Sequence, residues 1–592
     1  MKKKNNISQA MDKSYRQDKV SLRECLTIFD NIQLPWKLMI VGLVLTLVAA
    51  YATLQISDFS GNVVDANGNL PMNAMVIYIL TSLFAVICMA GKTVTSGLAC
   101  EQINYRLRKK LWHKIIVTKQ SSYDLDGGES MVSRVTADCD YASKFYATVA
   151  GIVGLVISTG IYLVGMYKIN VQMANYVLLF IPASILLGAG YTVLRFLVGR
   201  LMQAKLASST AYLAERTKDI ALIKTSNAQK KELEEGRKYF KEQYHAQVRF
   251  SLVSAVATSI DSMMQMLSIA IPFLVGAVFV EKGILTIGAI VTFNTLFGSV
   301  KGVFNSLIVF AGDFKEANGA LARITRFFKV EEECPDEGIA LAADAQEDIS
   351  FQKVNFGYTD HQVLKNFSCS IPKNKVTAIV GTNGSGKSTT FKLMTRLYEP
   401  NDGQILFGSE DSAGYSLHSW RNKVCLIAQG SPMMAGTIRE NMCYGRSDAV
   451  SEEELLEVAK LSHVYDFVKD LPDGFDTVVA AGGGNFSGGQ KQCIAIARAM
   501  LRKADYLLLD EATSNLDVKR EKDVMEAMNS LMKDRTTIII AHSLSTIRNA
   551  DHVIVINNGE LEMEGSPAQI LERTDNYLSK MMGRKMVPSI AE

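Results

Sequence analysis

The stretch VTAIVGTNGSGKSTTFKLMTRLY (376–398) decides the fold of the second half of the chain. Its first five residues predict a buried strand, GTNGSGKST is a glycine-rich loop, and the remainder predicts an amphipathic helix. A phosphate-binding loop requires this strand–loop–helix order. The glycines let successive N–H groups face the phosphates, and the helix adds its positive end. We therefore expect ATP or GTP to bind Gly381, Thr382, Asn383, Gly384, Ser385, Gly386, Lys387, Ser388 and Thr389.

Two further roles follow from this loop and from a second apolar segment, YLLLDEATSNLD (506–517). Lys387 is expected to reach the terminal phosphates, and Ser388 to ligate Mg²⁺. The second segment predicts a strand that ends at Asp510, whose carboxylate can hold Mg²⁺ or its water. Glu511 is adjacent and is expected to polarise the attacking water. A plain buried strand with two capping acids is the alternative, which the neighbouring phosphate loop disfavours.

Composition excludes several other classes of protein. The 592 residues are 48% hydrophobic and 21% charged, and the formal net charge of +3 is too balanced to indicate a nucleic-acid partner. The nine cysteines are sparse and odd in number, which argues against a secreted disulfide framework. No CxxC pair occurs, which disfavours a zinc site.

The apolar residues are concentrated in the first half, in runs about as long as the ~20 residues that a membrane-spanning helix needs. Any single run could be a buried core helix, but six within about 310 residues make a membrane domain the better interpretation. The predicted spans are 38–57, 66–91, 145–167, 169–194, 250–280 and 283–312.

The loops between these spans predict their orientation. The connections 101–142 and 199–249 are long and rich in Lys and Arg, whereas the other loops are short and carry few basic residues. The positive-inside rule then places the long connections and both termini in the cytoplasm. The basic segment Met1–Val20 precedes any apolar run and is expected to be a cytoplasmic extension, not a signal peptide.

The chain also contains FSGGQKQCIAIARA (486–499), which resembles the signature of the ATP-binding cassette (ABC) family. In that family two cassettes pair head to tail, and each nucleotide lies between one phosphate loop and the signature of the partner. The resemblance therefore implies that Ser487, Gly488, Gly489 and Gln490 bind the partner's nucleotide. A helix N-terminus suits this role, because its N–H groups and dipole attract phosphate.

Other motifs match the family in order. Tyr358 corresponds to the aromatic residue that stacks on adenine, and Gln429 to the glutamine that joins Mg²⁺ to the membrane helices. His542 corresponds to the histidine that contacts the γ-phosphate, and SNLD (514–517) to the loop that crosses the dimer interface. The chain departs from the family pattern at four positions, Ala480, Ala481, Phe486 and Cys493. The two alanines replace the usual Gly-Glu, which puts the usual cassette-to-membrane contact in doubt.

Over nearly its whole length the chain resembles a half-size exporter of the type IV fold. The fold class implied is an all-α six-helix transmembrane domain with long cytoplasmic helix extensions, followed by an α/β P-loop ATPase domain. Segments near 121–130 and 215–226 would be coupling helices, the second reaching the partner's cassette. The expected divisions are a cytoplasmic extension (1–33), the transmembrane domain (34–328), a linker (329–345), the cassette (346–575) and a C-terminal tail (576–592).

The resemblance implies ATP-driven export by alternating access, with ATP and Mg²⁺ at the interface of two cassettes. The expected partners are a second half-transporter, the lipid bilayer and a transported amphipathic small molecule, drug, peptide or lipid. A homodimer is favoured because both halves of the ATP site look intact, and a heterodimer stays open. An importer of a metal chelate and an ATP-gated channel or regulator are the alternatives. The implied location is the bacterial inner membrane, with the cassette and both termini in the cytoplasm.

Charged residues inside the predicted spans are candidates for substrate binding. Lys92, Asp261 and Lys301 are expected at one level near the inner leaflet, with Gln265 beside Asp261. They would either border the substrate cavity or lie at the cytoplasmic interface as packing and snorkelling residues. The sequence favours neither interpretation.

Overall fold

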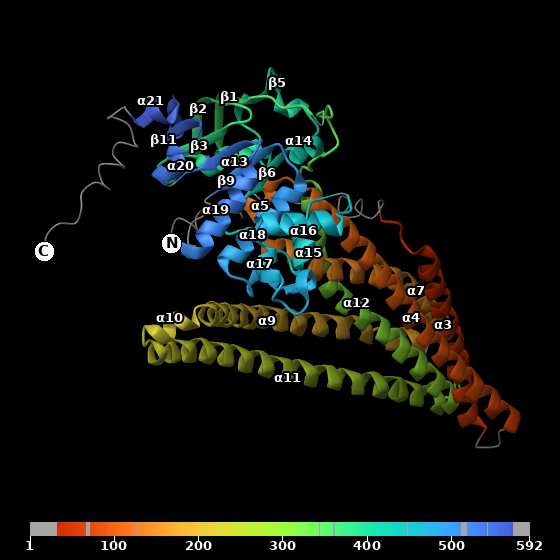
Figure 1. Cartoon of the computed structure of the whole chain (residues 1–592). Helices are drawn as coiled ribbons and strands as arrows, with labels where there is room; N and C mark the ends of the chain where they lie inside the picture. Colours follow the sequence, from red (N-terminus) through yellow and green to blue (C-terminus); the bar gives the residue numbers. More distant parts are fainter. Residues whose placement is uncertain are drawn as a thin grey trace. The chain divides into compact units, whose positions relative to one another are not determined.

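The structure is a computed structural model that describes residues 32–66, 71–126, 128–342, 344–358, 361–446, 448–510, 518–541 and 543–571. The chain divides into two compact units. The membrane unit comprises Met1–Ile115 and Glu129–Lys329, and the cassette unit comprises Ile116–Gly128 and Val330–Glu592. The first is helical, and the second contains the strands (Figure 1). A helical membrane domain followed by an α/β domain is the predicted fold class, which is confirmed.

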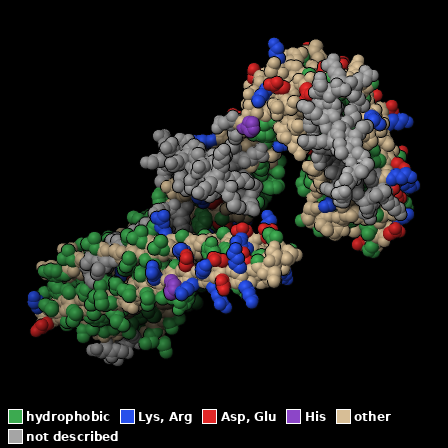
Figure 2. Space-filling model, turned by 90° about the vertical axis from the view of Figure 1, so that its left-hand side faces the viewer, with side chains coloured by type: hydrophobic (Ala, Val, Ile, Leu, Met, Phe, Trp, Pro, Cys, Tyr) green, Lys and Arg blue, Asp and Glu red, His purple; other side chains and the backbone are tan. Residues whose placement is uncertain are grey.

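The predicted spans lie on helices of the membrane unit. These helices are α3 (Trp36–Asp65), α4 (Met72–Val117), α7 (Cys139–Ile169), α8 (Val171–Leu178), α9 (Phe180–Lys218), α11 (Gln229–Glu281) and α12 (Ile287–Phe328). Among the described residues, four stretches are long and apolar enough to cross a membrane: Trp36–Asp65, Met72–Val117, Gly151–Ile169 and Gln229–Glu281. Ile287–Val303 is a shorter apolar stretch. On the face that Figure 2 shows, hydrophobic side chains cover much of this unit, and most of its visible charged side chains lie toward one end.

Two details differ from the sequence prediction. The loop expected from residue 58 begins later, because α3 continues to Asp65. The span expected at 169–194 is interrupted, since α7 ends at Ile169 and Asn170 caps the start of α8 by accepting a hydrogen bond from the Met173 N–H. The helix is interrupted again at Leu179 before α9 begins.

The helices pack in two groups within this unit. Helices α3, α7 and α12 lie together, and α9 and α11 run side by side as a hairpin closed by the short α10 (Ile220–Thr225) (Figure 1). The crossing of α3 and α12 is close, because a Cβ on Gly288 would lie 2.1 Å from the carbonyl oxygen of Gly61. The Asp65 carboxylate fixes the same crossing by accepting hydrogen bonds from the Thr286 hydroxyl (2.6 Å) and the Gly288 N–H (2.8 Å).

The described part of the cassette unit holds three sheets. The six-stranded sheet has the order β12-β11-β3-β10-β9-β6, in which β12 alone is antiparallel. Its strands are β3 (Val376–Gly381), β6 (Val424–Ile427), β9 (Tyr506–Asp510), β10 (Thr536–Ile540), β11 (His552–Asn557) and β12 (Glu560–Gly565). An antiparallel sheet, β2-β1-β4-β5, comprises β1 (Ile349–Gly357), β2 (Gln362–Ile371), β4 (Asp402–Phe407) and β5 (Glu410–Asp411). The third sheet pairs β7 (Gly436–Thr437) with β8 (Val478–Val479).

Helices cover these sheets and complete two main cores. They are α13 (Lys387–Met394), α14 (Leu417–Lys423), α15 (Ile438–Met442), α16 (Glu452–Leu461), α17 (Tyr465–Val468), α18 (Gly488–Arg502), α19 (Val518–Met532), α20 (Leu544–Arg548) and α21 (Pro567–Leu571). One core joins the antiparallel sheet to one face of the parallel sheet around Trp420 and Tyr506. The other packs α15, α16 and α18 against the opposite face.

The linker is more structured than its acidic composition predicts. Thr118 pairs with Glu332 in an antiparallel bridge, and the Glu333 N–H donates to the Val117 carbonyl (2.6 Å). This backbone pairing is why Ile116–Gly128, which contains α5 (Gln120–Asp126), groups with the cassette unit and not with the membrane unit to which the sequence assigned it.

Candidate nucleotide site

The site forms where parallel strands of the six-stranded sheet end. Strand β3 ends at Gly381 and leads into the phosphate loop, while β9 ends at Asp510. Strand β6 ends two residues before Gln429, and β10 ends two residues before position 542. Because parallel strands place their carboxyl ends at one edge, residues far apart in sequence meet there.

The loop 381–386 has a backbone that side chains would obstruct. Gly384 and Gly386 have φ angles of +83° and +111°, the left-handed region that glycine adopts without strain. A Cβ on Gly386 would lie 2.6 Å from Leu364 Cδ2, and one on Gly381 would lie 2.1 Å from the Ile556 carbonyl oxygen. The glycines are therefore required both by the turn and by the packing beneath it.

Lys387 opens α13 and is almost completely buried, with 7% of its surface exposed. Its Nζ donates to the carbonyls of Gly381 (3.0 Å) and Thr382 (2.9 Å), so the ammonium group lies over the loop. The Ser385 hydroxyl is buried without a hydrogen-bond partner among the described residues. An ammonium group that lies over the loop carbonyls is suited to receiving phosphate oxygens. So is a buried hydroxyl without a hydrogen-bond partner among the described residues.

A cavity of about 440 Å³ connects these residues with the other motifs. Its walls include the loop and helix residues Asn383, Gly384, Gly386, Lys387, Ser388 and Thr389, together with Tyr358, Val363, Gln429, Asp510 and Ile540. Ser388, Gln429 and Asp510 thus supply hydroxyl, amide and carboxylate oxygens to one space. Such oxygen donors fit Mg²⁺, which usually keeps water and phosphate oxygens as its remaining ligands.

Tyr358 lies at one side of this cavity, directly after β1. Its ring packs edge-on against Phe356 (5.1 Å between centroids) and Tyr398 (5.2 Å), and its hydroxyl lies 3.2 Å from the Thr389 hydroxyl. The Lys392 ammonium group lies 4.8 Å from the centre of the Tyr358 ring, a cation–π contact. Sequence reasoning missed Lys392, although it follows Thr389 by one helical turn and so shares its face.

Comparison with known proteins gives the family. Residues 36–303 match the ABC transporter transmembrane region, and residues 364–514 match the ABC transporter family. An uncharacterized ABC transporter ATP-binding protein of Bacillus subtilis is 33% identical over 486 residues, covering 80% of this chain and 79% of that protein. The chain belongs to the ABC transporter family.

Two further relatives of this ABC transporter extend over almost its full length. A multidrug resistance ABC transporter ATP-binding and permease protein of Lactococcus lactis is 28% identical, covering 94% of each chain. An ATP-dependent lipid A-core flippase of Chromobacterium violaceum is 29% identical, covering 92% of this chain and 94% of that protein. The fold also matches a bacterial Atm1-family ABC exporter with ATP bound, with a TM-score of 0.76, 24% identity and coverage of 94% of this chain and 100% of that chain.

The ABC signature begins helix α18. Ser487 and Gln490 form a capping box, in which the Gln490 N–H donates to the Ser487 hydroxyl (3.3 Å) and the Ser487 N–H donates to the Gln490 side chain (2.9 Å). Gly488 is exposed, and a Cβ there would meet nothing within 4 Å. Within the described part of the chain, Ser487–Gln490 do not line the cavity at Lys387.

The departures from the family pattern have simple packing explanations. Cys493 is buried in the core beneath α18, and Phe486 packs against Phe467 with 6.2 Å between ring centroids. Ala480 and Ala481 are exposed, and the Ala480 N–H is held by the Asn485 side chain (3.0 Å). The two alanines therefore present only methyl groups where the family pattern has a carboxylate.

Three of the predicted elements lie outside the described residues. They are Glu511, His542 and the segment 514–517. Their neighbours in the chain, Asp510 and Ile540, line the cavity.

The predicted intramembrane residues lie on three helices of the membrane unit, Lys92 on α4, Asp261 and Gln265 on α11, and Lys301 on α12. The Lys301 ammonium group donates to the Met264 carbonyl (3.3 Å) and the Ser268 hydroxyl (3.1 Å) on α11. The Gln265 amide donates to the Asp261 carboxylate (3.2 Å). Lys92 lies on α4 and is half-buried. Lys301 thus joins α12 to α11. Whether these residues also border a substrate cavity stays a prediction.

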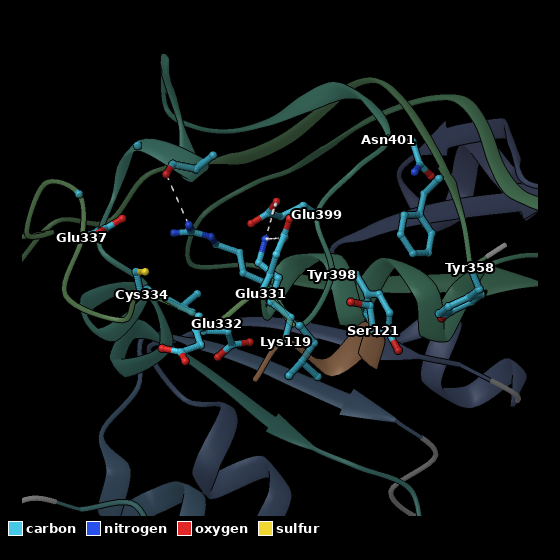
Figure 3. Close-up of a pocket in the computed structure, with 18 of the residues that line it drawn as sticks. Lys119, Ser121, Glu331, Glu332, Cys334, Glu337, Tyr358, Tyr398, Glu399 and Asn401 are labelled. Atoms are coloured by element: carbon cyan, nitrogen blue, oxygen red, sulfur yellow. Dashed lines mark hydrogen bonds and ion pairs between the residues drawn. The ribbon is translucent and has the colours of Figure 1, made fainter. Parts of the chain in front are cut away.

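A second, larger cavity of about 740 Å³ lies in the cassette unit on the other side of Tyr358 (Figure 3). Lys119, Glu331 and Glu399 lie together in it; Lys119 Nζ is 3.0 Å from Glu331 and 4.0 Å from Glu399. The hydrogen bond to Glu331 raises the pKa of Lys119 above its ordinary value. Arg396, whose pKa burial lowers, donates to the carbonyls of Ser412 and Tyr415. Lys119 thus joins the segment 116–128 to the linker at Glu331, while Arg396 holds a turn of the cassette itself.

Proposed function

We propose that two copies of this chain assemble into an exporter that hydrolyses ATP at two composite sites. The observation that carries the proposal is the set of residues that line the 440 Å³ cavity. Phosphate-loop residues and oxygen donors suited to Mg²⁺ line it, whereas among the described residues the signature Ser487–Gln490 does not. One cassette alone is then an incomplete site. A head-to-tail partner would bring its exposed Gly488 and the N-terminus of α18 to the phosphates.

Within each composite site the residues have distinct roles. Lys387 and the loop N–H groups hold the phosphates, and Tyr358 stacks on adenine. Ser388, Gln429 and Asp510 hold Mg²⁺, which when bound neutralises phosphate charge. Glu511 polarises the attacking water, and His542 contacts the γ-phosphate. Because both catalytic halves are present in this one sequence, a homodimer with two working sites is the simplest assembly.

In the membrane, α5 and α10 act as coupling helices that carry closure of the cassettes to the spans. The proposed domain boundaries are those that the sequence predicts, except that Ile116–Gly128 belongs to the cassette unit. Both termini and the cassettes are cytoplasmic, in a bacterial inner membrane. The multidrug and lipid-flippase relatives support outward movement of an amphipathic substrate.

Glu511→Gln in protein reconstituted in nanodiscs tests the catalytic assignment. We expect steady-state ATPase to fall by about 100-fold or more, because a general base contributes roughly 10²–10⁴-fold, while ATP binding is retained. The matched control is Glu453→Gln, an exposed acid on α16. Equal ATPase in wild type and Glu511→Gln would overturn the assignment.

Mixed dimers test the composite site directly. A Lys387→Ala copy and a Ser487→Phe copy are each expected to be inactive alone. Together they form dimers with one intact site, since the working phosphate loop of one copy meets the working signature of the other. Recovered ATPase supports the head-to-tail homodimer, and absence of recovery in dimers shown to contain both copies would overturn it. ATP-dependent accumulation of substrate in inverted vesicles would exclude the channel, and depletion would indicate an importer.

A further inference from the structure

A set of polar side chains lies on one face of α3 near its C-terminal end. Gln55, Asp58 and Asn62 follow one another at intervals of three and four residues, so they project from the same side of the helix. Asp58 is about 10 Å from the end of α3 at Asp65, at 1.5 Å per residue. In the proposed orientation this is the external part of the membrane unit.

These side chains line a cavity of about 240 Å³ between α3 and α4. The α4 side of the cavity is formed by Ile77, Tyr78 and Thr81. The Tyr78 ring stacks on Phe59 of α3, with 4.8 Å between centroids and 23° between ring planes, which joins the two helices beside the cavity. Ile77 is 61% exposed, so the cavity borders the apolar outer surface of the unit.

The cavity contains a carboxylate that the fold does not use. Within the described part of the chain, Asp58 makes no hydrogen bond or ion pair, and Lys168 interacts with it only electrostatically. Asp65 lies about two turns further along nearly the same face of α3. It shows the structural alternative, since both of its carboxylate oxygens accept hydrogen bonds from the start of α12. A charged side chain in a span without a structural partner indicates a functional site.

The residues that line the cavity indicate which class of ligand it can bind. A carboxylate with amide oxygens on either side attracts a cation, and the adjacent Tyr78 and Phe59 rings favour an organic cation over a metal ion. The volume is below the roughly 300–1,000 Å³ of pockets that enclose whole drug-sized ligands. The cavity therefore suits a cationic head, while an attached apolar chain would lie along the exposed Ile77.

We propose that this cavity is a binding subsite for the cationic head of an amphiphilic organic cation. This subsite rests on the proposed export function. It narrows the range of substrates, because it assigns a substrate class to the external half of the transport pathway. Asp58 provides the counter-charge, the amide oxygens of Gln55 and Asn62 attract the positive head through their dipoles, and Tyr78 covers one side of the head.

Binding of octyltrimethylammonium to the full-length protein in phosphatidylglycerol nanodiscs tests this site, with empty nanodiscs as baseline. We expect Asp58→Asn to raise the Kd by at least tenfold and Asp58→Glu to keep binding within about threefold of wild type. The matched control Glu281→Gln removes an exposed carboxylate at the end of α11 and should leave the Kd unchanged. Octyl sulfate should not bind at this site.

An unchanged Kd in a folded Asp58→Asn protein, or an equal loss in Glu281→Gln, would overturn the subsite. Phosphatidylcholine added to the nanodiscs identifies the source of the cation, since competition indicates a lipid headgroup and no competition a free amphiphile. The ATPase assay of the mixed dimers does not depend on a transported ligand, so it tests the proposed function separately from the subsite. Recovered ATPase with no octyltrimethylammonium binding would therefore refute the subsite alone, whereas failed recovery would refute the proposed function.

Discussion

The two units of this chain fix their polar side chains in different ways. In the cassette, Lys387 and Ser388 of α13, Gln429 after β6 and Asp510 at the end of β9 line one cavity at the ends of parallel strands. In the membrane unit, most hydroxyl groups donate to the carbonyl four residues earlier in their own helix, as Thr46, Thr53 and Ser57 do. The backbone topology thus assembles the site in one unit, whereas in the other each polar contact between helices is a separate local feature.

This difference implies that loss of one side chain has different consequences in the two units. A cassette residue acts on phosphate through a preformed cradle, so its loss should stop the chemistry while the fold survives. A membrane residue at a close helix crossing has no chemistry to perform, so its substitution should change stability first.

Lys387→Ala should have the largest effect. Removing the ammonium group takes away a charged donor from the terminal phosphates, and we expect ATPase to fall by roughly 10²–10³-fold, as for loss of one preorganised donor. The fold should persist, because the two hydrogen bonds described for the Lys387 ammonium group are to carbonyls of its own loop, whose course the glycines also determine. Steady-state ATPase and thermal unfolding of the same preparation check both statements. Retained ATPase would show that the cavity is not the hydrolytic site.

The residues that line the cassette cavity could be predicted from the sequence, whereas the contacts between the membrane helices could not. Gly381–Thr389 and Asp510 are predictable because phosphate binding needs a fixed residue order beside a strand, which leaves a local pattern. The grouping of Lys92, Asp261 and Lys301 was estimated from rise per residue alone. It missed that Lys301 bonds the α11 backbone at Met264, since helix rotation and partner choice leave no pattern in one sequence.

The Gly61–Gly288 crossing should give the next largest effect. A Cβ added at Gly288 would lie 2.1 Å from the Gly61 carbonyl oxygen and 2.6 Å from the Asp65 carboxylate, so α3 and α12 must separate. We expect Gly288→Ala to destabilise the membrane unit by about 1–3 kcal/mol, the usual cost of overpacking. Gly298→Ala on the same helix is the matched control, because a Cβ there meets nothing within 4 Å. Equal thermal unfolding of both variants in nanodiscs would show that this crossing is not tightly packed.

Lys119→Ala should have the smallest effect, although Lys119 holds the segment 116–128 to the linker through Glu331. The pair is largely exposed, with 35% and 80% of the two side chains accessible, and such pairs contribute about 0–1 kcal/mol. Because the folded pKa of Lys119 is raised above 10.5, its contribution is complete below that pH and is lost as the pH rises through the folded value. At pH 8 the Lys119→Ala variant should have a slightly lower Tm than the wild type, and this difference should disappear at higher pH. Lys469→Ala, which removes an exposed lysine as a control, should not lower the Tm. A large loss of stability at every pH would mean that the backbone pairing of Thr118 with Glu332 depends on Lys119. A single surface contact would then organise the segment 116–128 as strongly as the strand ends organise the nucleotide site.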